Sequence, residues 1–408
     1  MAQRWLVFTL VLILVSSTGL AADVADQRFP DPISLDVPHI STDRSVEYDF
    51  PIVYVRVPRK GNDAGSRWAE IAHPVLLDAG GDLMLLQPDG SEEVLVEGGK
   101  GSIIDPVVSI DGESVFYSHI HDMTVNWAGK YPKAGADIYR LHLATRKIER
   151  LTQQRFTPNT GAADWSSDFV SREDGKTHLD YGVFNTGPYP LPGGRLVFTS
   201  NRDGFRPPKH DGPTMQLFVM DDDGRNVECI GHLNIGMALH PVVLKDGRII
   251  FSSMESQGLR SGILWGLWSI HPDGTNWGPV ISAFDTGGAP NAFHFQTQLS
   301  DGSIIAEEYY NLNNSGFGAY FKLPPNVPNG YSAFGPGWRG DPRNTPFRFG
   351  RFYNSKPKLY RLPFTPFGLT SFTRFANNGE GPADPSVLGE KGSPAVGKFT
   401  HPSAAPDN

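Results

Sequence analysis

Short apolar runs joined by two-residue turns recur along the chain. The clearest copy runs from residues 240–243 (HPVV) through Asp246-Gly247 to residues 248–251 (RIIF). Each copy predicts a β-hairpin, because such a turn needs positive φ angles, which Gly and Asn adopt at low cost. Further copies begin near the following positions: His73, Asp105, Tyr189, His294 and His401.

A second alternating strand follows most copies and enters another turn, as in residues 217–224 (LFVMDDDG). Outer strands such as residues 147–151 come next. Two hairpins give four strands per unit, which is the composition of a β-propeller blade. A β-sandwich is the structural alternative, but sandwiches do not repeat a motif so regularly. No stretch shows sustained helical periodicity with caps.

We therefore predict an all-β fold, a β-propeller of four-stranded blades over residues 48–408. The pattern predicts five blade units and the start of a sixth at His401. A propeller closes by pairing its last blade with its first, since an open ring leaves exposed strand edges. An unfinished sixth unit leads us to expect a chain truncated at its C-terminus.

The first 21 residues are typical of a secretory signal peptide. Arg4 precedes an apolar run over residues 5–15, and small residues follow up to Ala21. The run is too short to span a bilayer. We expect cleavage after residue 21, an N-terminal extension over residues 22–47, and a periplasmic or secreted protein without membrane attachment. The alternative is an uncleaved membrane anchor.

Charge and cysteine content exclude several classes of function. The formal net charge of -8 argues against nucleic-acid partners, which need a basic surface, and against anionic membranes. The single cysteine, Cys229, excludes an intramolecular disulfide, a CxxCH site for covalent haem and a CxxC metal site.

Two stretches carry a family resemblance. Residues 196–204 (LVFTSNRDG), followed by residues 216–224 (QLFVMDDDG), resemble a blade of the TolB-like propeller family. Residues 51–56, 191–195, 294–314 and 397–403 resemble the middle propeller domain of hydrazine synthase alpha subunits. The resemblance implies the propeller alone, because the chemistry of that enzyme resides on c-type haems and this chain has no CxxCH.

Polar side chains concentrate around residues 294–314. His294, Gln296 and Gln298 share one face of a predicted strand, because strands alternate faces. Since inner strands of a blade line the channel, we predict that this segment binds a ligand or cation. The alternative is that its polar groups solvate the channel wall. The remaining candidates are Glu308, Tyr310, Asn311, Asn313 and Asn314.

Histidines begin several of the repeated units, and equivalent positions in a ring converge on one mouth of the channel. Converging imidazoles can bind a divalent metal. The candidate metal ligands are His240, His294, Gln296 and His401, which resemble the His and Gln ligands of propeller pectate-type lyases. In the alternative interpretation, each histidine hydrogen-bonds the turn of the next blade as part of the repeat.

Three further segments have a functional and a structural interpretation. His119 and His121 lie on one face, as metal ligands or as part of a polar loop. Residues 221–224 (DDDG) resemble a calcium loop without its later ligands, so a turn is favoured. Residues 324–350 form a long Pro- and Gly-rich loop, whose aromatic and basic residues either bind an anionic partner or pack on themselves.

No phosphate loop, nucleophile elbow or HExxH motif is present in the sequence. We predict a periplasmic binding or assembly scaffold, with a protein partner or small polar ligand at the channel mouth. Whether the chain is an enzyme stays open. The alternatives are a metal-dependent propeller lyase or hydrolase, and part of a haem-containing oxidoreductase whose cofactor segment is absent. No cofactor is assigned, and a divalent metal is the alternative.

Overall fold

The computed structural model describes residues 42, 47–58, 77–124, 126–127, 131–132, 134–153, 183–202, 215–231, 237–254, 265–281, 292–308, 319–325, 370–371 and 401–405. The predicted signal peptide, nearly all of the N-terminal extension and the loop beyond residue 325 lie outside these ranges. Within them there is no α-helix, and no helix is long and apolar enough to cross a membrane.

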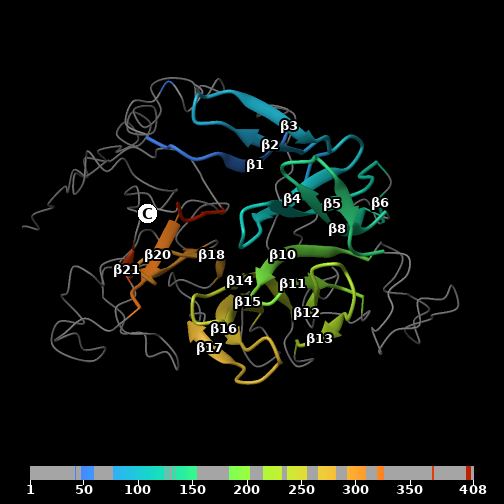
Figure 1. The fold of residues 1–408 in the computed structure, drawn as a ribbon. Coiled ribbons are helices and arrows are strands. Elements are labelled where there is room, and N and C mark those ends of the chain that lie inside the picture. Colours follow the sequence, from blue (N-terminus) through green and yellow to red (C-terminus); the bar gives the residue numbers. More distant parts are fainter. Residues whose placement is uncertain are drawn as a thin grey trace, which may run out of the picture.

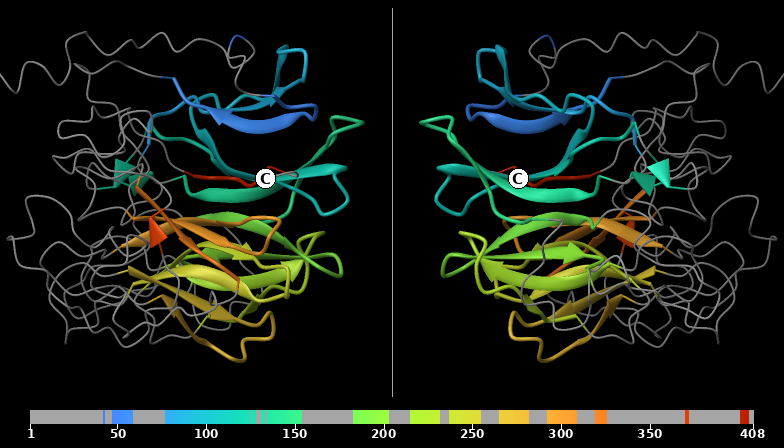
Figure 2. Two further views of the ribbon diagram at one scale, coloured as in Figure 1. Left: turned by 90° about the vertical axis from the view of Figure 1, so that its left-hand side faces the viewer. Right: turned by 90° about the vertical axis from the view of Figure 1, so that its right-hand side faces the viewer.

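Five antiparallel sheets follow one another along the chain and stand around a ring, as Figure 1 shows. Figure 2 shows the sheets from the side, stacked around the same axis. We number the sheets as blades 1 to 5. Their strands are, in order, β1(Ile52–Arg56), β2(Asp82–Leu86) and β3(Glu92–Val96) in blade 1; β4(Ser102–Val108), β5(Ser114–Ile120), β8(Ala136–His142) and β9(Ile148–Arg150) in blade 2; β10(Asn185–Leu191), β11(Arg195–Ser200), β12(Gln216–Asp221) and β13(Glu228–Cys229) in blade 3; β14(Ala238–Val243), β15(Ile249–Met254), β16(Trp265–Ile270) and β17(Gly278–Ile281) in blade 4; and β18(Phe293–Gln298), β19(Ile304–Glu308), β20(Ala319–Leu323) and β21(Thr370–Ser371) in blade 5. A short hairpin of β6(Asn126–Trp127) and β7(Tyr131–Pro132) extends from blade 2.

The predicted hairpin turns are confirmed. In blade 4 the amide of Gly247 donates to the carbonyl of Leu244 at 2.8 Å, and Gly247 has a φ of 86°. The Asp246 carboxylate accepts the amide of Arg248 at 3.0 Å and so stabilises the same turn. Residues 221–224 likewise form a turn, because the Gly224 amide donates to the Asp221 carbonyl at 2.9 Å.

Apolar side chains fill each interface between successive blades. Blades 2 and 3, for example, meet through Phe116 and Ile138 on one side and Phe198 and Phe218 on the other. Similar clusters join blades 1 and 2, 3 and 4, and 4 and 5. Alternating apolar residues therefore face a neighbouring blade, which explains why the sequence pattern has a period of two.

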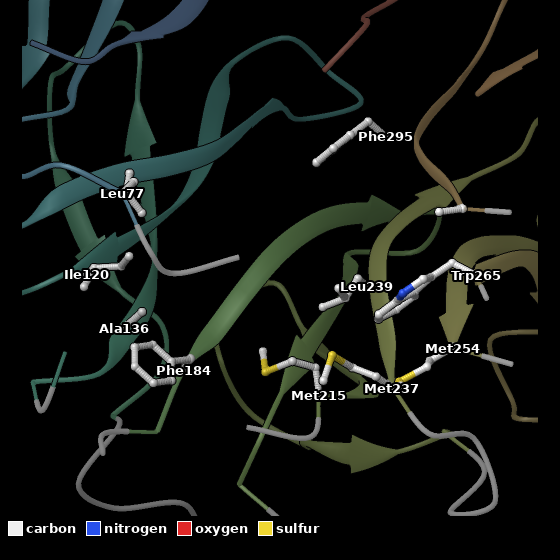
Figure 3. Packing of buried hydrophobic residues seen from close by; sticks show 11 residues of the cluster. Leu77, Ile120, Ala136, Phe184, Met215, Met237, Leu239, Met254, Trp265 and Phe295 are labelled. Atoms are coloured by element: carbon white, nitrogen blue, oxygen red, sulfur yellow. The ribbon is translucent and has the colours of Figure 1, made fainter. Parts of the chain in front are cut away.

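A further cluster joins residues from blades 2 to 5 with Leu77, which precedes β2 of blade 1, as Figure 3 shows. It consists of Leu77, Ile120, Ala136, Phe184, Met215, Met237, Leu239, Met254, Trp265, Ala292 and Phe295. Several residues of this cluster lie at the junctions between consecutive blades. Parallel bridges link Ala136 to Phe184 and Trp265 to Ala292 at these junctions.

Blade 1 differs from the others, because three of its strands are described where the others have four. Gly81, just before β2, bridges Ser102 of the next blade as Trp265 of β16 bridges Ala292. By this correspondence β2 is the third strand of its blade and β1 the second. Residues 401–405, the described part of the predicted sixth unit, lie in the middle of the ring between β18 and β1 (Figure 1).

Candidate functional site

Five residues near the axis share an uncommon backbone conformation, and we call them the bulge ring. They are Asp105, Gly187, His240, Phe295 and His401, with φ angles of 52°, 61°, 54°, 48° and 55°. The first four lie in the innermost strands β4, β10, β14 and β18, where the ladder to the next strand shifts register. The bulges therefore occupy equivalent positions in four blades, and His401 repeats their φ angle.

The sequence explains why the strands bulge there. Pro follows four of the five positions, as in His240-Pro241 and His401-Pro402. Pro has no N–H to donate to a ladder, so inside a sheet it occurs at edges or bulges. The repeated units are consequently aligned differently from the prediction. Gly187, two residues before Tyr189, is the equivalent of His240 in blade 3, and Phe295 rather than His294 is its equivalent in blade 5.

Neighbouring members of the bulge ring touch one another. The Asp105 carboxylate accepts the Gly187 amide at 3.0 Å. A Cβ atom on Gly187 would lie 3.2 Å from Pro241 Cδ, so the backbones of blades 3 and 4 approach closely here. The Phe295 ring centroid lies 4.3 Å from that of His240 and 3.9 Å from that of His401.

Three members of the bulge ring have strongly perturbed pKa values. Desolvation raises the pKa of Asp105 to about 6, against the opposing effect of the Gly187 amide. Burial, helped by the nearby His401, lowers the pKa of His240 to about 3. Burial lowers the pKa of His401 to about 4. At neutral pH both imidazoles are neutral and Asp105 is mostly ionised.

These three groups are surrounded by protein but keep contact with solvent. Asp105 and His240 are half-buried, and His401 is exposed. Many protein atoms lie nearby and shift the pKa values, although part of each residue stays open to solvent. Titratable groups with this combination are typical of binding sites and catalytic sites.

Gln296 and Gln298 have structural partners. The Gln296 amide nitrogen donates to the His240 carbonyl, and its oxygen accepts the Ser252 hydroxyl at 3.2 Å. The Gln298 oxygen accepts the Lys245 amide at 2.7 Å. Gln296 of blade 5 therefore stabilises the bulge of blade 4, and Gln298 of blade 5 stabilises the turn of blade 4 that contains Lys245.

His294 is fully buried, with its ring centroid 4.8 Å from Trp265 and 5.6 Å from His240. It stands opposite Glu307 in the ladder between β18 and β19. Glu307 is also fully buried, whereas the residue predicted from the sequence was its neighbour Glu308. The side chain of Glu308 lies outside the described part of the chain, as do the other candidates Tyr310, Asn311, Asn313 and Asn314.

Of the predicted metal ligands, His240, His294 and His401 do come together. Their rings meet edge to face, with centroids 5.6 Å apart for His240 and His294 and 6.3 Å apart for His240 and His401. Within the described ranges, no three His, Cys, Asp or Glu side chains are placed to hold one metal ion. The metal site stays a prediction.

His119 and His121 belong to a second polar cluster beside blade 2. His119 lies half-buried on β5, where burial lowers its pKa. His121 Nε2 lies 3.2 Å from the Tyr139 hydroxyl and 3.4 Å from the Asp137 carboxylate. Asp137 is fully buried and accepts the Thr152 hydroxyl at 2.6 Å. The two histidines thus extend a buried network rather than a free loop.

Comparison with solved structures supports the fold. Hydrazine synthase of Kuenenia stuttgartiensis is 14% identical over 69% of this chain and 38% of that chain, with a TM-score of 0.51. TolB of Agrobacterium tumefaciens is 18% identical over 50% and 58% of the two chains, with a TM-score of 0.34. An oligogalacturonate lyase in complex with manganese is 15% identical over 60% and 56%, with a TM-score of 0.36.

No protein-family model and no curated protein sequence matches the chain. The chain spans well under two thirds of the length of these solved relatives. At such identities the similarity concerns the fold and not the activity. The predicted propeller resemblance is confirmed at the level of the fold by the hydrazine synthase structure, and this chain is an all-β propeller with five described blades.

Proposed function

We propose that this chain is an exported β-propeller that serves as a binding scaffold, and that the bulge ring binds a small polar group. That group belongs to a ligand or to a partner protein held at the axis. Export rests on the signal-peptide pattern of residues 1–21. The rest of the proposal is drawn from the five blades and from the side chains at their centre.

The observation that carries the proposal is that residues other than glycine occupy strained positions of the bulge ring. A left-handed conformation costs roughly 1–2 kcal/mol for a residue with a Cβ atom. Gly187 shows that glycine fits the same bulge. The repeat architecture accounts for the bulges, but it does not account for Asp105, His240 and His401 in place of glycine. Strained residues of this kind cluster at functional sites.

The chemistry of the ring favours a polar ligand without strong negative charge. His240 and His401 are neutral at neutral pH and each offers one hydrogen-bond donor and one acceptor. Asp105 contributes negative charge above its pKa of about 6. The Phe295 ring packs against both imidazoles and so helps to position them.

The test compares wild type with the double variant His240→Gly/His401→Gly. Glycine adopts positive φ freely, so the variant keeps the backbone and loses both imidazoles. The matched control is His271→Gly, in the turn that joins the two outer strands of blade 4, β16 and β17. Native mass spectrometry of the exported protein, isolated from its own organism, is expected to show a bound molecule in wild type and control only.

The same bound molecule in all three proteins would overturn the proposal, and so would the absence of one in wild type. Elemental analysis of these samples addresses the alternative of a metal-dependent enzyme. About one divalent metal per chain, lost in a His294→Ala variant, would favour that alternative over the scaffold.

A further inference from the structure

Trp265 begins β16 and is fully buried in the cluster of Figure 3. Its indole N–H has no hydrogen-bond partner among the described residues. An indole nitrogen is a donor only, so this group needs an acceptor. Buried donors without an acceptor are rare in native proteins, and a water, an ion or a ligand that completes the bond is one explanation for such a group.

His240 Nε2 is a second buried nitrogen without a partner in the described part of the chain. The His294 ring contacts both residues, with its centroid 4.8 Å from Trp265 and 5.6 Å from His240. Two unpaired polar atoms on different strands, β16 and β14, thus flank one imidazole.

The surroundings of these atoms are apolar. Figure 3 places Trp265 among Leu239, Met237 and Met254, with the indole nitrogen on the side of Leu239. Burial keeps the pKa of His294 well below its ordinary value, so its imidazole is uncharged at neutral pH. The fully buried Glu307 stands opposite His294 and disfavours an anion here. An indole N–H is a donor only and offers nothing to a cation, so a neutral polar group fits these atoms best.

We propose that Trp265 Nε1 and His240 Nε2 form a binding site for the carbonyl or hydroxyl oxygen of a small uncharged molecule. The indole donates to that oxygen, and the neutral imidazole donates to or accepts from the same polar group. The inference rests on the proposed binding function and deepens it by naming the ligand class. Trp265 itself lies outside the bulge ring, so the two proposals can fail separately.

The probes are acetamide, acetate and acetamidinium, which have nearly the same shape but are neutral, anionic and cationic. The readout is the indole N–H signal of Trp265 in protein labelled with ¹⁵N on tryptophan. A Trp265→Phe variant assigns that signal, and the other tryptophans of the 8 in the chain serve as internal controls. We expect acetamide to move the Trp265 signal downfield in a saturable way, with smaller effects from acetate and acetamidinium.

Acetamide is also expected to raise the Tm of wild type but not of Trp265→Phe. The Phe variant removes one N–H and keeps an aromatic ring, and circular dichroism checks that it folds. The proposal is overturned if no probe moves the Trp265 signal, which would leave a water as the occupant. It is also overturned if a charged probe binds better, or if all the indole signals shift alike.

The two proposals are separated by the glycine double variant and the Phe variant. If acetamide moves the Trp265 signal in wild type but not in His240→Gly, while the natural bound molecule survives in His240→Gly/His401→Gly, the bulge ring does not hold that molecule and only the acetamide site stands. If the natural molecule depends on the bulge ring but acetamide does not shift Trp265, only the present inference fails.

Discussion

At the residue scale, most members of the bulge ring have a side chain although their positive φ angles disfavour a Cβ atom. His240 has a φ of 54°, where a Cβ atom is crowded and glycine is not. His240→Ala and His240→Gly both lose the ring contact with Phe295, and they differ only in backbone freedom. We expect the Gly variant to be more stable than the Ala variant by about 1 kcal/mol, measured by urea denaturation.

His271 provides the control for this comparison. It lies on an exposed turn and is not among the residues with positive φ. Glycine there gains no relief and increases the entropy of the unfolded chain, so His271→Gly should be less stable than His271→Ala. If the Gly and Ala variants had the same order of stability at positions 240 and 271, the backbone of His240 would not be strained.

Asp105 gives a pH-dependent prediction at the same scale. Its folded pKa is about 6 against an ordinary value of 3.8, so the folded state binds its proton more tightly than the unfolded chain. This contribution to stability is present below pH 3.8 and is lost as the pH rises through 6. Asp105→Asn cannot ionise and tolerates positive φ.

We therefore expect Asp105→Asn to match wild type near pH 4 and to exceed it by about 1–2 kcal/mol at pH 7. The pKa shift alone would give about 3 kcal/mol, and residual solvent contact at Asp105 reduces it. Urea denaturation at the two pH values measures the difference. A difference independent of pH would show that the Asp105 carboxyl is not desolvated in the folded protein.

At the element scale, the hairpins were predictable and the bulges were not. Asp246-Gly247 encodes its turn locally, so the sequence suffices. The bulge at Phe295 is visible only in the pairing with β19, where Thr297 rather than Gln296 stands opposite Ile305. Strict alternation along the strand therefore predicted that His294, Gln296 and Gln298 share one face. The bulge position of Phe295 was not predicted, because the sequence there lacks the His-Pro pair.

The same limit applies to the buried acid of blade 5. The polar character of the segment predicted Glu308, and only the ladder between β18 and β19 shows that Glu307 stands opposite His294. By contrast, the blade-start histidines His240 and His401 were found, because a repeated His-Pro pair is visible without any knowledge of register.

The position of residues 401–405 leads to a prediction about strand register. Leu85 of β2 corresponds to Ser269 of β16, four residues after Gly81 and Trp265 respectively. Ser269 pairs with Ile250, and Ile250 pairs with Val242, two residues after His240. Since Leu85 pairs with Val53, the residue two after His401 should stand opposite Val53. Residues 401–405 would then supply the inner strand of blade 1.

A disulfide tests this register. In a Cys229→Ser background, which removes the exposed free thiol, Val53→Cys with Ser403→Cys should form an internal crosslink on mild oxidation. Val55→Cys with Ser403→Cys is the control, because it is displaced by two residues on the same face of β1. Equal crosslinking of both pairs, or of neither, would contradict the assigned register. Non-reducing electrophoresis after proteolysis between the two cysteines gives the readout.

At the scale of the whole molecule, blades 2 and 3 are joined by polar bonds as well as apolar packing. Asn185 of β10 donates to the Ala136 carbonyl at 3.2 Å and to Asp137 Oδ1 at 3.3 Å. Its own oxygen accepts the Ser200 hydroxyl at 2.9 Å and Arg202 at 2.5 Å. One amide therefore connects a buried carboxylate in blade 2 to a buried guanidinium in blade 3.

Asn185→Ala should destabilise the protein by about 2–4 kcal/mol, because it withdraws partners from a buried carboxylate and a buried guanidinium together. The loss should be concentrated at the junction of the two blades. The Ala136 amide donates to the Val183 carbonyl across that junction at 2.9 Å, so its hydrogen exchange reports on the contact.

The control is Thr199→Val, which removes the hydroxyl bonds to Thr186 inside blade 3 alone. We expect Thr199→Val to cost about 1 kcal/mol and to leave exchange at Ala136 relative to global unfolding unchanged. If Asn185→Ala instead lowered protection equally in every blade, the ring would behave as one cooperative unit, and the polar link would stabilise the whole propeller rather than one interface.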